Sequence, residues 1–97
     1  MNNNYTDFNM DPEGNTRFYG IYRATVVGNV DTERKGRLSL VIPQINGFSA
    51  IDSVPGIFPA NVAAPVSATL IPALGKNVWV MFENGETEYP VWIGIKL

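Results

Sequence analysis

The sequence predicts an all-β domain, a small five-stranded barrel with a long central connection. Hydrophobic residues alternate with other residues along 18–30, 37–43 and 77–83, which is the periodicity of strands. Four prolines and three glycines between residues 44 and 76 leave no room for a long amphipathic helix. The chain has 97 residues, which is enough for one domain with a modest core.

The first part of the chain is expected to be a polar arm, residues 1–16, preceding a folded domain at residues 17–97. The arm is rich in asparagine and acidic residues and shows no hydrophobic periodicity, which is typical of an extended or disordered leader. Its large apolar residues after the initiator are Tyr5, Phe8 and Met10. They are candidates for docking the arm on a neighbouring surface, and a floppy leader is the alternative.

The first predicted strand is residues 18–30. Tyr22, Ala24 and Val26 share one face, and Gly28 invites a bend or bulge. A long first strand that curves is what a small closed barrel needs.

A charged turn and a second strand follow. Residues 31–36 read DTERKG, with four charged side chains among six. The turn is either a contact loop or a solvated hairpin tip, and charge runs favour the tip. The second strand, residues 37–43, turns Leu38, Leu40 and Ile42 to one face.

The middle of the chain is expected to be a long connection, residues 44–64, followed by a short strand near 66–71 and a turn at 72–76. A connection of this length in a compact domain is usually functional or packed against something. It carries too many apolar side chains for a free loop: Ile45, Phe48, Ile51, Ile57 and Phe58.

The final hairpin, residues 77–97, turns at Asn84-Gly85, because both residues tolerate positive φ. A four-residue loop opposes Phe82 to Tyr89, and it opposes Val80 to Val91. A two-residue loop is the alternative register. The four-residue loop is preferred because it places similar apolar side chains opposite each other on the two strands. Each such cross-strand pair stabilises the sheet by about 0.2–1 kcal/mol. Pro90 has no N–H and should lie at an edge or a strand start.

The preferred register divides the hairpin into two faces. The expected core residues are Val78, Val80, Phe82, Val91 and Ile93. The other face holds Trp79, Met81 and Trp92, which would lie against a neighbouring protein or under the long connection. An exposed apolar face of this kind requires a protein partner.

Charge and composition exclude several function classes. The formal net charge is −2, whereas nucleic-acid and anionic-membrane partners call for basic patches. The sequence has no apolar run of membrane-spanning length and no obvious signal peptide. Histidine and cysteine are absent, which excludes a Ser-His-Asp triad and thiolate metal sites. Glu83, Glu86 and Glu88 surround a hairpin tip, where burial does not tune a pKa. We therefore expect no enzyme activity, metal or cofactor.

A series of motifs is similar to a known family. In chain order they are Asp31, Gly36-Arg37, LSLVIP, Pro72-x-x-Gly75, VWVMFENGE and PVWIG. From about Ile21 to Gly94 the chain resembles the oligonucleotide/oligosaccharide-binding-type (OB) barrel of phage tail-spike and baseplate hub proteins. A similar barrel occurs in the T-even tail-lysozyme spike and in the valine-glycine-repeat spikes of type VI secretion. The final hairpin is the most specific part of the match.

Three departures from the family pattern stand out. Thr32 stands where the family often has proline, Glu86 stands where aspartate is usual, and the middle of the chain lacks a tryptophan. Family members usually continue into a β-helical needle or a lysozyme domain, and the residues before Leu97 build neither. A needle is therefore expected on another polypeptide, or this barrel serves as a hub or adaptor without one.

The resemblance implies a structural role in a contractile phage tail. It implies a location in the virion, at the tail tip or baseplate, after assembly in the host cytoplasm. It also implies a homotrimer that docks onto a hub ring and onto a separate spike or needle chain. The candidate interface residues are Trp79, Met81, Trp92, Tyr5, Phe8 and Met10.

Two other functions remain open. A module that binds single-stranded nucleic acid or carbohydrate would stack its ligand on aromatic side chains and hold phosphates with arginines. The residues for it would be Tyr19, Tyr22, Trp79, Trp92, Arg17 and Arg23. The acidic balance counts against the nucleic-acid version. A chaperone or secretion-linked adaptor with the same barrel is the third possibility.

Overall fold

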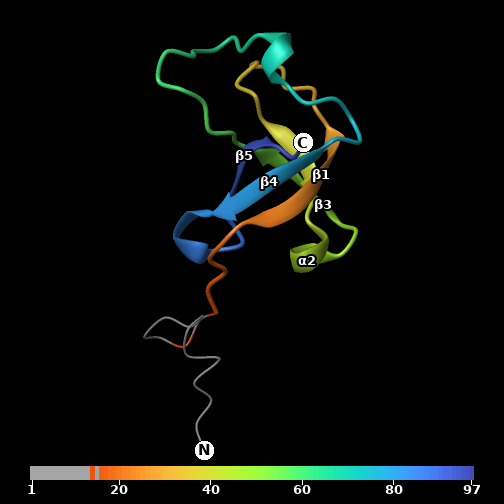
Figure 1. Cartoon of the computed structure of the whole chain (residues 1–97), viewed down its shortest axis with the longest axis vertical. Coiled ribbons are helices and arrows are strands. Elements are labelled where there is room, and N and C mark those ends of the chain that lie inside the picture. Colours follow the sequence, from red (N-terminus) through yellow and green to blue (C-terminus); the bar gives the residue numbers. More distant parts are fainter. Residues whose placement is uncertain (1–13, 15) are drawn as a thin grey trace, which may run out of the picture.

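The structure, a computed structural model, describes residue 14 and residues 16–97, and its strands form one antiparallel sheet (Figure 1). The five strands are β1 (Tyr22–Gly28), β2 (Leu38–Val41), β3 (Ala50–Val54), β4 (Asn77–Phe82) and β5 (Pro90–Ile95). Their order in the sheet is β3-β2-β1-β4-β5. The short turns are α2 (Pro43–Asn46), η1 (Ala68–Leu70) and η2 (Glu83–Gly85). The all-β class and the five strands are confirmed, while residues 1–13 and 15 of the expected arm lie outside the described residues.

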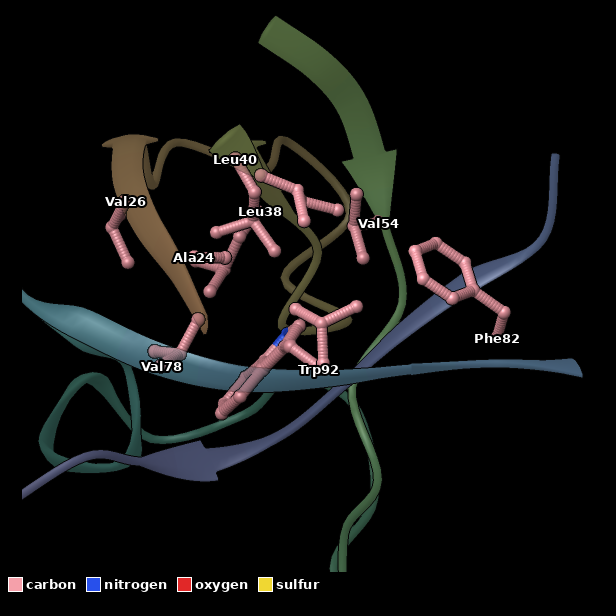
Figure 2. Packing of buried hydrophobic residues seen from close by; sticks show 10 residues of the cluster. Ala24, Val26, Leu38, Leu40, Val54, Val78, Phe82 and Trp92 are labelled. Atoms are coloured by element: carbon pink, nitrogen blue, oxygen red, sulfur yellow. The ribbon is translucent and has the colours of Figure 1, made fainter. Parts of the chain in front are cut away.

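The core lies on the concave side of the sheet, where side chains from all five strands meet (Figure 2). The predicted grouping of residues on one face of β1 and of β2, and the predicted core face of β4, are confirmed. Eight core residues are at most 1% exposed: Ala24, Val26, Leu38, Leu40, Ile42, Val54, Val78 and Val80. The predicted bulge is also present, since the pairing of β1 with β2 shifts between Val26 and Gly28.

The middle of the chain differs from the expected long connection. Residues 44–64 contain most of α2 and the whole of β3, which pairs with β2 through Leu38 with Val54 and Val41 with Ala50. Sequence periodicity misses β3 because Asp52 and Ser53 are both exposed and Ser53 has φ of 57°. Backbone pairing with β2, rather than side-chain alternation, therefore holds this strand in the sheet.

The strand predicted near residues 66–71 is wrong. The segment contains the single 3₁₀ turn η1, and the Ser67 side chain caps this turn by accepting the N–H of Thr69. A serine that satisfies a backbone donor locally favours a turn over a strand. β3 therefore takes the place of the strand predicted at residues 66–71 in the five-stranded sheet, and residues 55–76 form the long connection.

The register of the final hairpin is also corrected. Phe82 lies opposite Pro90 and Val80 lies opposite Trp92, which is one residue away from the predicted pairing. A slip of one residue turns every side chain of a strand to the other face. Trp92 therefore enters the core at 4% exposure, whereas Val91 and Ile93, expected in the core, are half-buried. The positive φ values of Asn84 and Gly85 and the position of Pro90 at the start of edge strand β5 are as predicted.

The two edges of the sheet approach each other at one point. Trp92 donates its backbone N–H to the Pro55 carbonyl at 2.9 Å, and Ile57 donates to the Trp92 carbonyl at 3.1 Å. These two bonds form a single parallel bridge between Gly56 and Trp92. A side chain at Gly56 has no room, because a Cβ there would lie 2.6 Å from Trp92 Cε2. The strands themselves form an open sheet whose edges are joined at this residue.

Candidate interaction surfaces

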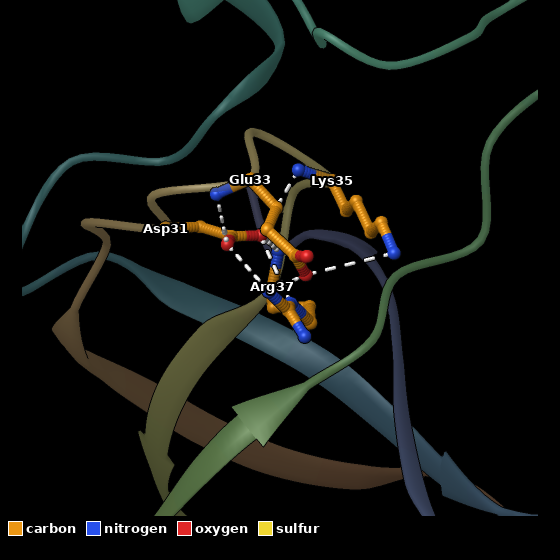
Figure 3. A network of polar contacts seen from close by, with 4 residues as sticks. All are labelled: Asp31, Glu33, Lys35 and Arg37. Carbon is orange, nitrogen blue, oxygen red and sulfur yellow. Dashed lines mark hydrogen bonds and ion pairs between the residues drawn. The ribbon is translucent and has the colours of Figure 1, made fainter.

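The loop between β1 and β2 is organised around one carboxylate. Asp31 accepts backbone N–H groups from Glu33, Lys35 and Arg37 at 3.0–3.2 Å. It also accepts Nε and Nη2 of Arg37 at 3.1 and 2.7 Å (Figure 3). The hydrogen bonds from the Arg37 side chain hold the pKa of Asp31 well below its usual range, and Asp31 in turn raises the pKa of Arg37. The Asp-to-Arg spacing seen in the sequence thus builds a closed, charge-assisted loop.

The base of this loop is packed into the domain, and its tip is in solvent. Gly36 has φ of 80°, and a Cβ at this position would lie 2.6 Å from Phe58 Cζ. Its carbonyl accepts the indole N–H of Trp92 at 2.9 Å. The Phe58 ring meets the Trp92 ring edge-on, with centroids 5.5 Å apart. Residues 32–35 are exposed, as expected for a hairpin tip.

The candidate interface residues fall into three groups. Trp79 is half-buried on the outer face of β4, with Lys96 Nζ 5.9 Å from its ring centroid, and Met81 is 42% exposed. Both point away from the core, as the alternation of β4 predicts. Trp92 is buried beneath residues 56–58 of the long connection and offers no surface to a partner. Tyr5, Phe8 and Met10 lie outside the described residues.

Among the described residues, two of the four aromatic side chains expected to stack on a nucleic acid or sugar pack within the domain instead. Trp92 is in the core. Tyr22 packs against Phe82 with ring centroids 5.3 Å apart, and its hydroxyl donates to the Tyr19 carbonyl. Arg17 forms an ion pair with Glu86 at 2.8 Å, so this cation is not free for a phosphate. Binding of this kind relies on aromatic faces open to the ligand.

Ionisable residues do not gather into a metal or acid–base centre in the part of the chain that the structure describes. Within residues 14 and 16–97, no three acidic, histidine or cysteine side chains lie close enough together to hold a metal ion. Glu83, Glu86 and Glu88 belong to the loop between β4 and β5, and Glu86 is held by Arg17. No helix among these residues is long and apolar enough to cross a membrane.

Comparison with protein families matches residues 22–96 to the type VI secretion system/phage-baseplate injector OB domain. The chain belongs to this family. The match begins at the first residue of β1 and ends one residue after β5, so it includes all five strands. A search of curated proteins finds no match.

Membership of the injector OB domain family confirms the resemblance drawn from the sequence motifs. The family description names a structural domain of an injection apparatus and no enzymatic reaction. The Asp31–Arg37 loop, Gly56 and Trp92 all lie within the matched residues. Sequence reasoning missed the link between Gly36 and Trp92, because Trp92 lies between Val91 and Ile93 and has no polar neighbour that marks its inward face.

Proposed function

We propose that this protein is a hub or spike component of a contractile phage tail, positioned at the baseplate, where it self-associates and docks onto other tail proteins. The observation that carries the proposal is the family match over residues 22–96, which spans the whole sheet. Type VI secretion belongs to the same family description, and a secretion adaptor is therefore the second candidate.

The domain acts in this proposal as a closed OB barrel. The parallel bridge between Gly56 and Trp92 supports closure, because it joins the β3 side of the sheet to β5. Closing a sheet removes the free edges that would otherwise pair with other chains. A closed barrel leaves its outer side chains, among them Trp79 and Met81, as the means of association.

Self-association is proposed to give a homotrimer on the tail axis that binds a hub ring and a separate spike or needle chain. Met81 is an exposed apolar side chain on the outer face of β4, next to the half-buried Trp79. Exposed apolar patches are common at protein interfaces. The assembly site is the host cytoplasm and the final location is the tail tip of the virion.

Two measurements test this function. Imaging of assembled particles that carry a tag on this chain should place the tag on the tail axis at the baseplate, and a particle without the tag is the control. Size-exclusion chromatography with light scattering should give the mass of a trimer for the purified chain. A strict monomer that binds no tail protein would contradict the proposal, and genes for a secretion machine beside this gene would favour the adaptor.

A further inference from the structure

Charged side chains are distributed unequally between the two ends of β4. Lys76 precedes the strand, and Lys96 lies beside its first residue, since the Lys96 N–H bonds to the Asn77 carbonyl at 2.9 Å. The loop at residues 31–37 lies at this same end, because Val26 of β1 bonds to the Lys76 carbonyl at 2.9 Å. We call this the basic end: its residues include five cations, Arg34, Lys35, Arg37, Lys76 and Lys96. Its carboxylates are Asp31 and Glu33, and Asp52 of β3 lines a hollow together with Arg37.

The opposite end of β4 is acidic. The strand leads into the loop at residues 83–89, which carries Glu83, Glu86 and Glu88. Arg17 pairs with Glu86 and is the one cation in this group. We call this the acidic end, and Figure 1 shows that it lies at the tip of the β4 arrow, away from the 31–37 loop. The molecule is therefore polarised in charge along β4.

The basic end also carries a cleft with one apolar side. Its volume is about 300 Å³, its apolar lining is Val30, Val66, Ala68 and Ile71, and its polar lining is Asn29, Asp31, Arg34 and Arg37. This volume is at the lower limit of the roughly 300–1,000 Å³ typical of small-molecule sites, so the cleft suits one large side chain. Val30 at its rim is 91% exposed.

One wall of the cleft comes from a segment without charge. Residues 53–75 contain no lysine, arginine, aspartate or glutamate. The Val66 N–H bonds to the Arg34 carbonyl at 2.8 Å, which holds this segment against the β1–β2 loop. A cleft with an apolar side and an exposed arginine is therefore a fixed feature of the basic end.

The acidic end presents a matching tip. Tyr89 is 52% exposed and follows Glu88 directly. Its backbone is fixed, since the Tyr89 N–H bonds to the Glu86 carbonyl and the Glu83 N–H bonds to the Tyr89 carbonyl, both at 2.9 Å. A preorganised tip loses little conformational entropy on binding.

We propose that the acidic end of one copy docks onto the basic end of a second copy, with the Tyr89 ring on the apolar side of the cleft and Glu88 against Arg34. The occupant is a second copy because the two ends of this chain are complementary: one has an aromatic tip beside a carboxylate, and the other has a cleft with an apolar side and an exposed cation, Arg34. A contact between unlike surfaces builds a ring or a head-to-tail stack. The inference goes beyond the proposed function, because docking through the Trp79 and Met81 face does not require it.

The test is a charge swap in the full-length chain, followed by sedimentation velocity over a range of concentrations. Arg34→Glu and Glu88→Arg should each weaken self-association at least about tenfold, because each places like charges opposite one another. The double variant should recover association close to that of the original chain. Self-association of the original chain should also be weaker at roughly 0.5 M salt than at roughly 0.05 M salt, since salt screens exposed charges.

Control variants separate this contact from others. Asn46→Glu adds a carboxylate at an exposed position of α2, outside both loops, and should leave association unchanged. Tyr89→Ala should weaken association without changing the salt dependence, because it removes the apolar tip alone. Thermal unfolding of each variant checks that the fold is retained.

The proposal is overturned if the original chain shows no charge-dependent association, or if the double variant stays as weak as the single variants. Its failure differs from failure of the proposed function. If imaging places the chain at the baseplate but the double variant does not recover association, the proposed function stands and this contact is rejected. If the double variant recovers association but the chain is absent from the particle, this contact stands and the proposed function is rejected.

Discussion

The indole N–H of Trp92 donates a 2.9 Å hydrogen bond to the carbonyl oxygen of Gly36, 56 positions earlier in the chain. This bond joins edge strand β5 to the loop between β1 and β2. The same tryptophan pairs through its backbone with Pro55 and Ile57. One residue thus connects the charged loop, the start of the long connection and the last strand.

Truncation of Trp92 should destabilise the fold. Trp92→Ala leaves a cavity in the core and should cost about 3–5 kcal/mol in the free energy of unfolding, a large share of the roughly 5–15 kcal/mol of a typical domain. Urea unfolding followed by circular dichroism measures this loss. Assembly should fall in parallel with folding, since Trp92 is buried. Loss of assembly with unchanged stability would instead place Trp92 in an interface.

The hydrogen bond itself can be isolated with Trp92→Phe. The phenyl ring keeps most of the apolar contact but leaves the Gly36 carbonyl without its donor, at about 1–3 kcal/mol. Urea unfolding again provides the measurement. A cost near zero for Trp92→Phe would show that packing alone sets the contribution of this residue.

Gly36 should tolerate no side chain. Gly36→Ala introduces a Cβ at φ of 80°, 2.6 Å from the Phe58 ring, and should cost at least about 1–3 kcal/mol in unfolding free energy. Gly94→Ala in β5 is the matched control, because no atom lies within 4 Å of its added Cβ. The control should change stability by less than about 0.5 kcal/mol. Equal effects of the two variants in chemical denaturation would argue against the close packing of Phe58 on Gly36.

The ion pair of Asp31 with Arg37 should make stability depend on pH at the acid side. The hydrogen bonds from Arg37 lower the pKa of Asp31 in the folded state below the unfolded value of about 3.9. The unfolded state then binds more protons between the two values, so stability is lost as pH falls below about 4 and is fully present above it.

Asp31→Asn checks the source of that dependence. The variant should be less stable than the original chain at neutral pH, and the difference should shrink as the pH approaches 2. Thermal unfolding across the pH range gives the comparison, and Asp52→Asn, at an exposed position on β3, is the control. A difference between Asp31→Asn and the original chain that stays constant from pH 7 to pH 2 would rule out this role for the carboxylate.

Met81 should matter for association rather than for folding. Met81→Glu places a charge on the outer face of β4, where the side chain is 42% exposed, and should change stability by less than about 0.5 kcal/mol. It should weaken self-association about tenfold or more, because a partner would have to bury the new carboxylate. Light scattering over a concentration series measures this, with Gln44→Glu on α2 as the control. Unchanged association of Met81→Glu would show that the interface does not include this face of β4.

Much of the sheet could be predicted from the sequence, and β3 could not. Leu38, Leu40 and Ile42 alternate cleanly, because β2 has one face in the core and the other face outside it. β3 has Asp52 and Ser53 in succession, and it belongs to the sheet through backbone bonds to β2. Such bonds form with almost any side chain and leave no periodic signal.

The interaction surfaces were predicted less well than the sheet. Trp79 and Met81 point outward as expected, since β4 alternates strictly between core and surface. The charge polarity between the Arg34 loop and the Glu88 loop has no sequence signal. The Glu88 loop follows β4 directly in the chain, but the Arg34 loop reaches the other end of β4 only in the folded sheet. Antiparallel pairing of β1 with β4 places them there.

The sequence by itself determined the all-β class, the residues that share a face on β1 and β2, the core face of β4, the turn at Asn84-Gly85 and the family. Each of these depends on local alternation, on turn residues or on motifs that stand in the chain. Only the tertiary structure decided the register of β5. Val91, Trp92 and Ile93 are all apolar, so alternation does not choose between the two faces of the strand. The choice is made by contacts distant in sequence: Trp92 lies opposite Val80, beneath Gly56, with its N–H on the Gly36 carbonyl.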